Sequence, residues 1–145
     1  MKKILISTGG SGGHVIPALN LYHHLKKDFD VKIYTDVRGA KFIPSEVNKT
    51  IFEVKKIPEK IYLLPLKIIF LIFAFIKSLL DLSLNKIDII ISTGGYMSLP
   101  TVLAGKMFNK KIFLFEPNSI IGRSNKFLLN FSSKIMCYDK DLKGL

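Results

Sequence analysis

A glycine-rich turn that ends in histidine, Gly9-Gly10-Ser11-Gly12-Gly13-His14, follows the first apolar run of this 145-residue chain. Glycines at the start of a helix let a phosphate approach the backbone N–H groups closely, and the helix dipole favours the anion. The dinucleotide pattern G-x-G-x-x-G would need glycine at Val15, although Asp36 stands at a plausible spacing for a ribose contact. A P-loop would end in Gly-Lys-Ser or Gly-Lys-Thr instead of Gly-His. The turn therefore predicts a site for a phosphorylated ligand of another kind.

Two further loops have the same setting, and His14 gives the set a titratable side chain. The run Thr93 to Pro100 contains two glycines, and Glu116 to Ser119 follows the next apolar run. A histidine can accept a proton or bind a phosphate, because imidazole titrates near neutral pH. Taken singly, His14 could be structural, the glycines could form a tight turn, and Glu116 could cap a helix. Three such loops at the carboxyl ends of parallel strands favour a ligand site, because open α/β sheets bind ligands at that edge.

The elements that must position these loops alternate along the chain. Apolar runs predict strands at 4–6, 31–35, 51–54, 87–92, 112–115 and 135–138, and amphipathic patterns predict helices at 17–27, 61–84, 98–108 and 123–131. Residues 36–48 are expected to form a loop with a turn or two of helix. Repeated strand–helix units predict an α/β fold, a Rossmann-like parallel sheet with helices on both faces. We expect residues 1–145 to form a single domain.

The amino-acid composition indicates which cell compartment and which classes of partner suit the protein. The formal charge is +11, from 22 basic and 11 acidic residues, and this excess suits an anionic membrane surface or anionic substrates. The aromatic residues lie within apolar runs, which disfavours nucleic-acid binding. A single cysteine, Cys137, and the lack of a secretory signal at the first residues favour a cytoplasmic protein. We expect no cofactor and no metal.

The segment 61–84 is unusually apolar. Its longest uninterrupted run has nine residues, Ile68 to Ile76, and about 18 would be needed to span a bilayer, which disfavours a transmembrane helix. On a helix, its polar residues form one stripe: Lys67, Lys77, Ser78 and Asp81. One side must cover the sheet, and the remaining flank suits docking at a membrane interface. The predicted docking residues are Lys67, Phe70, Phe73, Phe75 and Lys77; the alternative is a fully buried core helix.

The motifs GGSGGHVIPAL, STGGYMSLP and FEPN…GRSNK resemble, in order and spacing, those of the MurG family. These bacterial enzymes transfer N-acetylglucosamine from UDP-N-acetylglucosamine to lipid I, forming lipid II in peptidoglycan synthesis. The resemblance covers residues 4 to about 138 and implies the N-terminal half of a GT-B fold. In that fold the N-terminal domain binds the undecaprenyl-pyrophosphate-linked acceptor and docks on the membrane. The C-terminal domain binds most of the sugar donor.

Carried over by position, the resemblance assigns a role to each loop. It implies donor contacts from Ser11, Gly12 and Gly13, an acceptor-side loop of Gly94, Gly95 and Tyr96, and a sugar contact from Asn118. His14 becomes the first candidate for the general base, or alternatively a ligand of the acceptor pyrophosphate, and Glu116 becomes the second candidate base. The sequence departs from the family pattern at Ser11, which keeps the hydroxyl of the usual threonine. It also departs at Phe115 and Pro117, which replace histidine and glutamine beside Glu116.

The resemblance also implies that the donor-binding domain is absent from these 145 residues. We therefore expect an acceptor-binding half that is inactive alone and lies peripherally at the cytoplasmic face of the bacterial inner membrane. A separate donor-binding domain would complete it. The alternative is a non-catalytic membrane-anchoring subunit of a split glycosyltransferase.

Overall fold

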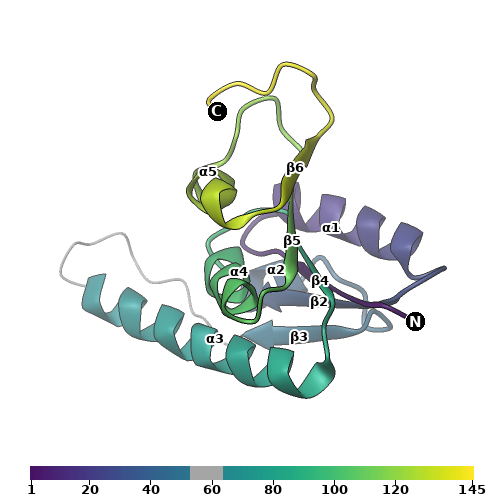
Figure 1. Ribbon diagram of the computed structural model, residues 1–145, viewed down its shortest axis with the longest axis vertical. Coiled ribbons are helices and arrows are strands. Elements are labelled where there is room, and N and C mark those ends of the chain that lie inside the picture. The colour runs from purple at the N-terminus through teal and green to yellow at the C-terminus, as the bar shows by residue number, and fades with distance from the viewer. Residues whose placement is uncertain (53–63) are drawn as a thin grey trace.

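The computed structural model describes residues 1–52 and 64–145 and shows a six-stranded parallel sheet (Figure 1). The strand order is β3-β2-β1-β4-β5-β6. The strands are β1 (Lys3–Ser7), β2 (Asp30–Asp36), β3 (Lys49–Phe52), β4 (Ile89–Ser92), β5 (Lys111–Glu116) and β6 (Lys134–Cys137). The helices are α1 (Gly12–Leu25), α2 (Val37–Ala40), α3 (Leu64–Asn85), α4 (Ser98–Met107) and α5 (Arg123–Leu128), which continues into a 3-10 turn, Leu129–Phe131. The predicted α/β class and Rossmann-like sheet are confirmed.

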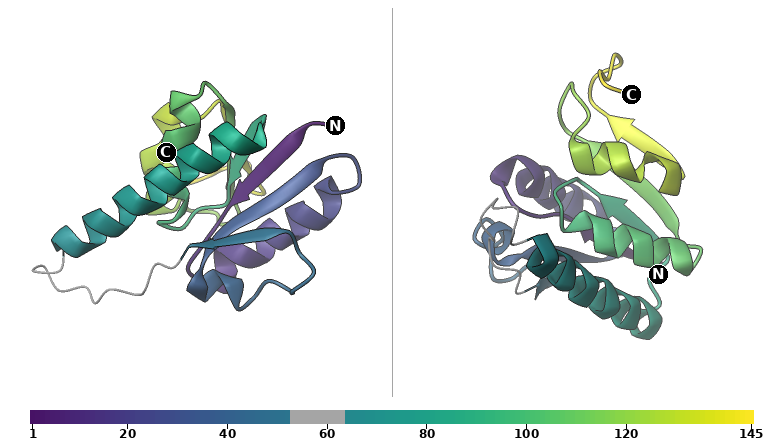
Figure 2. Two further views of the ribbon diagram at one scale, coloured as in Figure 1. Left: turned by 90° about the horizontal axis from the view of Figure 1, so that it is seen from below. Right: turned by 90° about the vertical axis from the view of Figure 1, so that its left-hand side faces the viewer.

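Alternation along the strands divides the core into two layers. In β1, Leu5 packs with the residues of α3, α4 and α5, whereas Ile4 and Ile6 pack with Val15 and Ala18 of α1. Successive side chains of a strand point to opposite faces, so each buried strand must be apolar on both sides. Figure 2 shows the result, with α1 on one face of the sheet and α3, α4 and α5 on the other.

The helix α1 begins earlier than its sequence predicts. Ser11 is the N-cap in an extended conformation, and the N–H groups of His14 and Val15 both donate to the Ser11 carbonyl, at 3.1 and 3.2 Å. The helix therefore starts at Gly12, and Pro17 lies inside it. Proline is common near a helix start and glycine weakens helices, so the sequence pattern favours Pro17 as the beginning. The consequence is that His14 belongs to the first turn of α1.

Two members of the polar stripe of α3, Ser78 and Asp81, face the domain together with part of its apolar surface, and a second apolar flank faces outward. Ser78 lies within hydrogen-bonding distance of Thr101 on α4, with their hydroxyl oxygens 3.3 Å apart, and the Tyr34 hydroxyl of β2 donates to Asp81 at 2.7 Å. The Lys77 ammonium lies 5.0 Å from the centre of the Phe52 ring. Lys77, Ser78 and Asp81 therefore attach the helix to its own domain.

This orientation corrects part of the predicted docking flank. Phe70 and Phe75 are partly buried against the core, because they lie on the side that packs over α4 and the sheet. Phe73 is 66% exposed. The other large hydrophobic residues of α3 that are exposed are aliphatic: Leu66, Ile68, Ile69, Ile72, Ile76, Leu80 and Leu84. The side chain of Lys67 lies outside the described part, as do residues 53 and 54 of the third predicted strand and residues 61–63 of the predicted helix.

By length and composition, α3 could also cross a membrane. The window Ile68–Asn85 has a mean hydropathy of 1.9, and 17% of it is buried. The nine-residue run counted in the sequence understates this apolar character, because only a few polar residues interrupt the longer helix. A single such helix is weak support for a span, and its hydrogen bonds to α4 and β2 suit a helix attached along the domain surface.

Candidate functional site

The predicted loops meet at the carboxyl edge of the sheet. The first glycine loop (residues 9–14) follows β1, the second glycine loop (residues 93–97) follows β4, and the third loop (residues 117–122) follows β5. Because β1, β4 and β5 are adjacent and parallel, their carboxyl ends lie side by side. The sheet order therefore brings together residues that are up to about a hundred positions apart in the chain.

His14 joins the first two loops directly. Its Nδ1 lies 2.9 Å from the carbonyl oxygen of Thr93, and the Thr93 hydroxyl donates to the carbonyl oxygen of His14 at 3.0 Å. The His14 ring is half-buried, whereas Thr93 is fully buried. The predicted base is thus held against the second glycine loop by bonds to both its ring and its backbone.

The backbones of the two glycine loops are in close contact. A Cβ on Gly95 would lie 2.5 Å from the carbonyl oxygen of Gly9, so no larger residue fits without moving one of the loops. Gly95 also has φ of +84°, and Gly94 has φ of +94°, a region that L-residues with side chains rarely adopt. Both glycines are therefore required by the close approach of the two loops and by their own conformation.

Asp36, at the end of β2, is a third link that the sequence offered only as a ribose contact. Its carboxylate is fully buried. One oxygen accepts hydrogen bonds from the N–H groups of Gly10 and Gly39, at 3.0 and 2.8 Å. The other accepts from the Tyr96 hydroxyl at 3.0 Å and from Arg38 Nε at 3.4 Å. Asp36 therefore fixes the first glycine loop to the second and does not face a ligand.

The predicted substrate residue Tyr96 uses its hydroxyl for this link. Burial of the phenol, and then the negative charge of Asp36, raise the pKa of Tyr96 to about 12. The Arg38 guanidinium lies over the Tyr96 ring, 5.7 Å from its centre. The hydroxyl of Tyr96 is therefore a fixed hydrogen-bond donor, and contacts to a ligand are left to its ring.

Glu116 organises the third loop. Its side chain is fully buried. One carboxylate oxygen accepts hydrogen bonds from the backbone and side-chain N–H groups of Asn118, at 3.2 and 2.9 Å. The other accepts from the N–H of Gly122 and from Asn125 Nδ2, at 2.9 and 3.0 Å. With both oxygens occupied, Glu116 suits a role in shaping the loop better than one as a proton acceptor, and Asn118 keeps its amide oxygen and one amide hydrogen for a ligand.

Asn125 on α5 connects this loop to the second glycine loop and was not singled out from the sequence. It is fully buried, and its amide oxygen accepts a hydrogen bond from the Ser92 hydroxyl at 3.3 Å. The Ser92 hydroxyl oxygen in turn accepts from the N–H of Gly94 at 3.2 Å. The only signal in the sequence was the position of Asn125 within the stretch GRSNK. The hydrogen bonds of Asn125 and Asp36 make the three loops one connected unit.

The start of α1 leaves donors available at this edge. No acidic residue lies in its first turn, and the Ser11 side chain makes no capping bond. Among the described residues, the N–H groups of Gly12 and Gly13 have no hydrogen-bond partner. A Cβ on Gly13 would meet only the Ser11 hydroxyl, at 3.7 Å. The predicted residues Ser11, Gly12 and Gly13 therefore form an open, electropositive helix start that can receive an anion.

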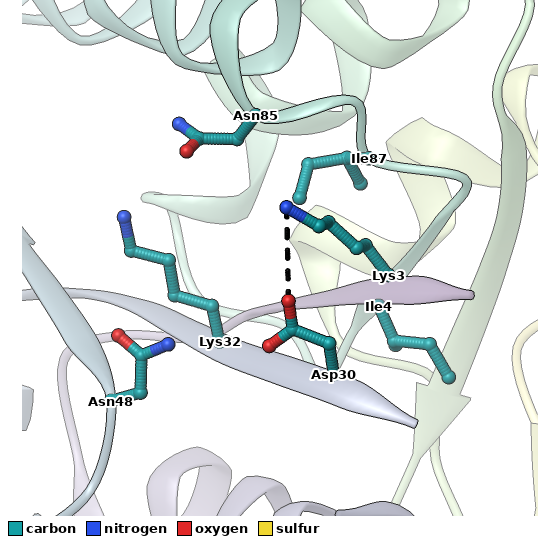
Figure 3. Close-up of a pocket in the computed structure, with 7 residues that line it drawn as sticks. All are labelled: Lys3, Ile4, Asp30, Lys32, Asn48, Asn85 and Ile87. Carbon is teal, nitrogen blue, oxygen red and sulfur yellow. Dashed lines mark ion pairs between the residues drawn. The ribbon is translucent and has the colours of Figure 1, made fainter. Parts of the chain in front are cut away.

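A second feature, at the opposite edge of the sheet, is not part of this site. A shallow cavity of about 250 Å³ lies at the amino ends of the strands, between Lys3, Asp30, Lys32, Asn48 and Asn85. Figure 3 shows how these side chains surround it, with Lys3 and Asp30 forming an ion pair at 3.8 Å. None of the predicted site residues contributes to it. Within residues 1–52 and 64–145, no cluster of three or more His, Cys, Asp or Glu side chains could hold a metal ion.

Fold and site together define a class. A Rossmann-like parallel sheet with two touching glycine loops and a histidine at its carboxyl edge is an α/β domain with a candidate ligand site at the edge where such sheets bind ligands. Residues 4–137 match the N-terminal domain of glycosyltransferase family 28, and the chain belongs to this family.

Individual relatives agree with this assignment. The chain is 53% identical, over 98% of its length, to the UDP-N-acetylglucosamine–N-acetylmuramyl-(pentapeptide) pyrophosphoryl-undecaprenol N-acetylglucosamine transferase of Pelagibacter ubique, and covers 40% of that protein. It is 34% identical over its full length to the enzyme of the same name from Rickettsia typhi, covering 37% of it. The crystal structure of Acinetobacter baumannii MurG matches the whole chain with a TM-score of 0.84 at 18% identity, and the chain covers 44% of it. The chain thus spans about 40% of the length of its curated relatives.

Proposed function

We propose that these residues form the acceptor-binding part of a transferase that moves N-acetylglucosamine from UDP-N-acetylglucosamine to lipid I, the step that the relatives' names describe. The observation that carries the proposal is the joint edge of the three loops. There His14 lies against the second glycine loop, and the open N–H groups of Gly12 and Gly13 begin α1. The family resemblance implied contacts from Gly12 and Gly13 to the sugar donor; we instead assign their N–H groups to the acceptor's pyrophosphate, because they begin the helix that carries His14. We assign His14 to the reacting hydroxyl.

In this reaction His14 acts as the general base. The acceptor hydroxyl gives its proton to the imidazole, and its oxygen forms a bond to the anomeric carbon of the donor sugar. The bond between that carbon and the β-phosphate oxygen breaks, and UDP leaves with the electron pair. A positioned base of this kind contributes roughly 10²–10⁴-fold to rate. Glu116 acts indirectly in this scheme, by holding Asn118 and the third loop in place.

Binding of the acceptor can be tested on the chain itself. We expect a short-chain lipid I analogue to shift the amide NMR signals of Gly12 and Gly13. Gly13→Asp places a negative charge where the pyrophosphate would lie, and the space around Gly13 accommodates the side chain. We expect this variant to bind at least about tenfold more weakly, equivalent to about 1.4 kcal/mol. Asn20→Asp adds the same charge at an exposed position on the same helix and should bind normally; equal affinities for the two variants would contradict the proposal.

We further propose that the outward side of α3 docks on an anionic membrane surface, which places the domain peripherally at the cytoplasmic face of the membrane. The continuous row of exposed residues that includes Ile72, Phe73 and Ile76 supports this proposal. A row of apolar side chains exposed on a surface helix is typical of a surface that binds a membrane or a partner. The charge of +11 attracts anionic headgroups. This surface also favours the second candidate function, a membrane-anchoring subunit of a split transferase.

Vesicle flotation tests the docking surface. We expect the chain to float with vesicles that contain anionic lipid, and Phe73→Asp with Ile76→Asp to abolish this. The matched control replaces one phenylalanine and one isoleucine of similar exposure on the opposite face of the sheet, Phe42 and Ile16, with aspartate. That control should still float. Equal flotation of the α3 variant and the wild type would rule out this surface.

A further inference from the structure

We infer that the second glycine loop sets the tautomer of His14: the carbonyl of Thr93 holds the proton on Nδ1 and leaves Nε2 as a bare acceptor. The inference concerns the protonation of one ring and can be measured without any substrate. Only its chemical use, as the preset base for the acceptor hydroxyl, rests on the proposed function. In that use Thr93 and Gly94 are positioning residues.

The hydrogen bond decides the tautomer. His14 Nδ1 lies 2.9 Å from the carbonyl oxygen of Thr93. A carbonyl oxygen only accepts, so this bond exists when Nδ1 carries hydrogen, and a neutral imidazole carries only one. Nε2 then has a free lone pair, and it makes no hydrogen bond within the described part of the chain. The opposite tautomer would set two lone pairs against each other.

The second loop holds the backbone of His14 as well as its ring. The fully buried Thr93 donates its hydroxyl hydrogen to the carbonyl oxygen of His14 at 3.0 Å. The first turn of α1 and the end of β4 are thereby joined by two bonds between the same two residues. Rotation of the imidazole would break the bond from Nδ1 to the Thr93 carbonyl, while the bond from the Thr93 hydroxyl would still hold the His14 backbone in place. The ring therefore has one favoured orientation.

Gly94 provides the space in which the ring lies. A Cβ at this position would lie 2.9 Å from His14 Nδ1 and 3.0 Å from Cε1. The φ of +94° would by itself favour glycine, but the contact adds a separate requirement that involves the histidine. A side chain at position 94 therefore requires the imidazole or the second glycine loop to move, and either movement disturbs the bond from His14 to the Thr93 carbonyl.

This arrangement suits proton transfer without reorientation. When Nε2 takes a proton, both ring nitrogens become donors, and the bond from Nδ1 to Thr93 is retained. The ring can therefore accept the proton of the acceptor hydroxyl and later release it from the same atom. A base fixed by a second group in this way is already oriented before the substrate arrives.

Nitrogen NMR tests the inference on the chain as it is. Long-range ¹H–¹⁵N correlations of labelled protein at about pH 9, where free imidazole is neutral, distinguish the two tautomers. The His14 signals are those that His14→Gln removes. His23 and His24 are exposed in the last turn of α1 and serve as internal controls. We expect protonated Nδ1 and bare Nε2 for His14 alone; an Nε2-protonated or averaged pattern like that of His23 would overturn the inference.

A pair of glycine variants tests the role of the second loop. We expect Gly94→Ala to displace the ring and convert His14 to the averaged pattern. Gly144→Ala introduces a side chain at a similar φ, +88°, away from His14, and should leave the pattern unchanged. If Gly94→Ala does not fold, the wild-type spectrum still decides the tautomer. The chain can also be fused to the C-terminal part of the Pelagibacter ubique relative. A fusion that has the expected tautomer but no transferase activity would contradict the proposed function and leave this inference standing.

Discussion

A buried carboxylate is stable in a protein when several donors surround it, and Asp36 is surrounded by backbone, phenol and guanidinium donors. Those donors come from both glycine loops and from α2. At the scale of single residues, the site is therefore held by side chains that do not face the ligand. Asn125 and Glu116 have the same role on the other side of the second glycine loop.

The link between Asp36 and Tyr96 predicts a dependence of stability on alkaline pH. In the unfolded chain a tyrosine loses its proton near pH 10, whereas burial and Asp36 raise the pKa of folded Tyr96 to about 12. Between these values the folded state binds more protons, so the free energy of unfolding falls as pH rises. Tyr34, whose pKa is raised by burial and then by Asp81, adds to the same loss.

Urea unfolding at about pH 8 and pH 11 measures this effect, which for one group is at most about 1.4 kcal/mol per pH unit. We expect Tyr96→Phe to be less stable than the wild type at pH 8, because Asp36 loses a donor. Its stability should then fall less on going to pH 11. Tyr138→Phe, at an exposed position, is the control and should behave as the wild type. An equal fall in Tyr96→Phe and the wild type would contradict the assigned pKa.

At the scale of elements, the close packing of α4 on β4 depends on one glycine. A Cβ on Gly105 would overlap Cδ1 of the buried Ile90. We expect Gly105→Ala to destabilise the fold by about 1–3 kcal/mol through overpacking, although alanine is the better helix former. Ile90→Val removes the overlapping atom and should by itself lower stability by about 0.5–1.5 kcal/mol.

The double variant is the decisive measurement. If the overlap is the cause, Gly105→Ala combined with Ile90→Val is less destabilised than the sum of the two single changes, because the new methyl group fills the space that Cδ1 leaves. Chemical denaturation of the four proteins gives this coupling. Simple additivity would show that the effect of Gly105→Ala has another origin.

Helices and strands could be predicted from the sequence where the local residue pattern and the tertiary contacts favour the same structure. The isoleucine-rich run at 87–92 predicts a buried parallel strand, and β4 (Ile89–Ser92) lies within it. The start of α1 could not be predicted, because a turn of glycines becomes helical only when Ser11 and the second glycine loop hold it. Which side of α3 faces inward could not be predicted either, because hydrogen bonds that join Ser78 to Thr101 and Asp81 to Tyr34 decide it.

At the scale of the whole molecule, the sequence predicts where the site lies but not the long-range contacts that hold it. Loops after β1, β4 and β5 were placed on one edge by the strand order, which the alternating pattern implies. The contacts that fix them, such as Asp36 to Tyr96, join residues 60 positions apart. Spacing in the sequence gives no indication of such pairs, and only the assembled sheet brings them together.

Transfer activity is the property to test at this scale, because the chain spans about 40% of the relatives that carry the transferase name. We expect the purified 145-residue chain to give no detectable lipid II. We expect activity when it is fused to the remaining C-terminal part of the Pelagibacter ubique relative, since 53% identity over the shared region favours a compatible joint.

Within that fusion, His14→Gln should lower kcat by roughly 10²-fold or more, the scale of a lost general base. Its acceptor affinity should change little. His23→Gln, nine positions further along α1, is the matched control and should retain activity. A fusion in which His14→Gln and His23→Gln are equally active would remove His14 from the chemistry. Turnover by the unfused chain would show that these residues contain a complete transferase.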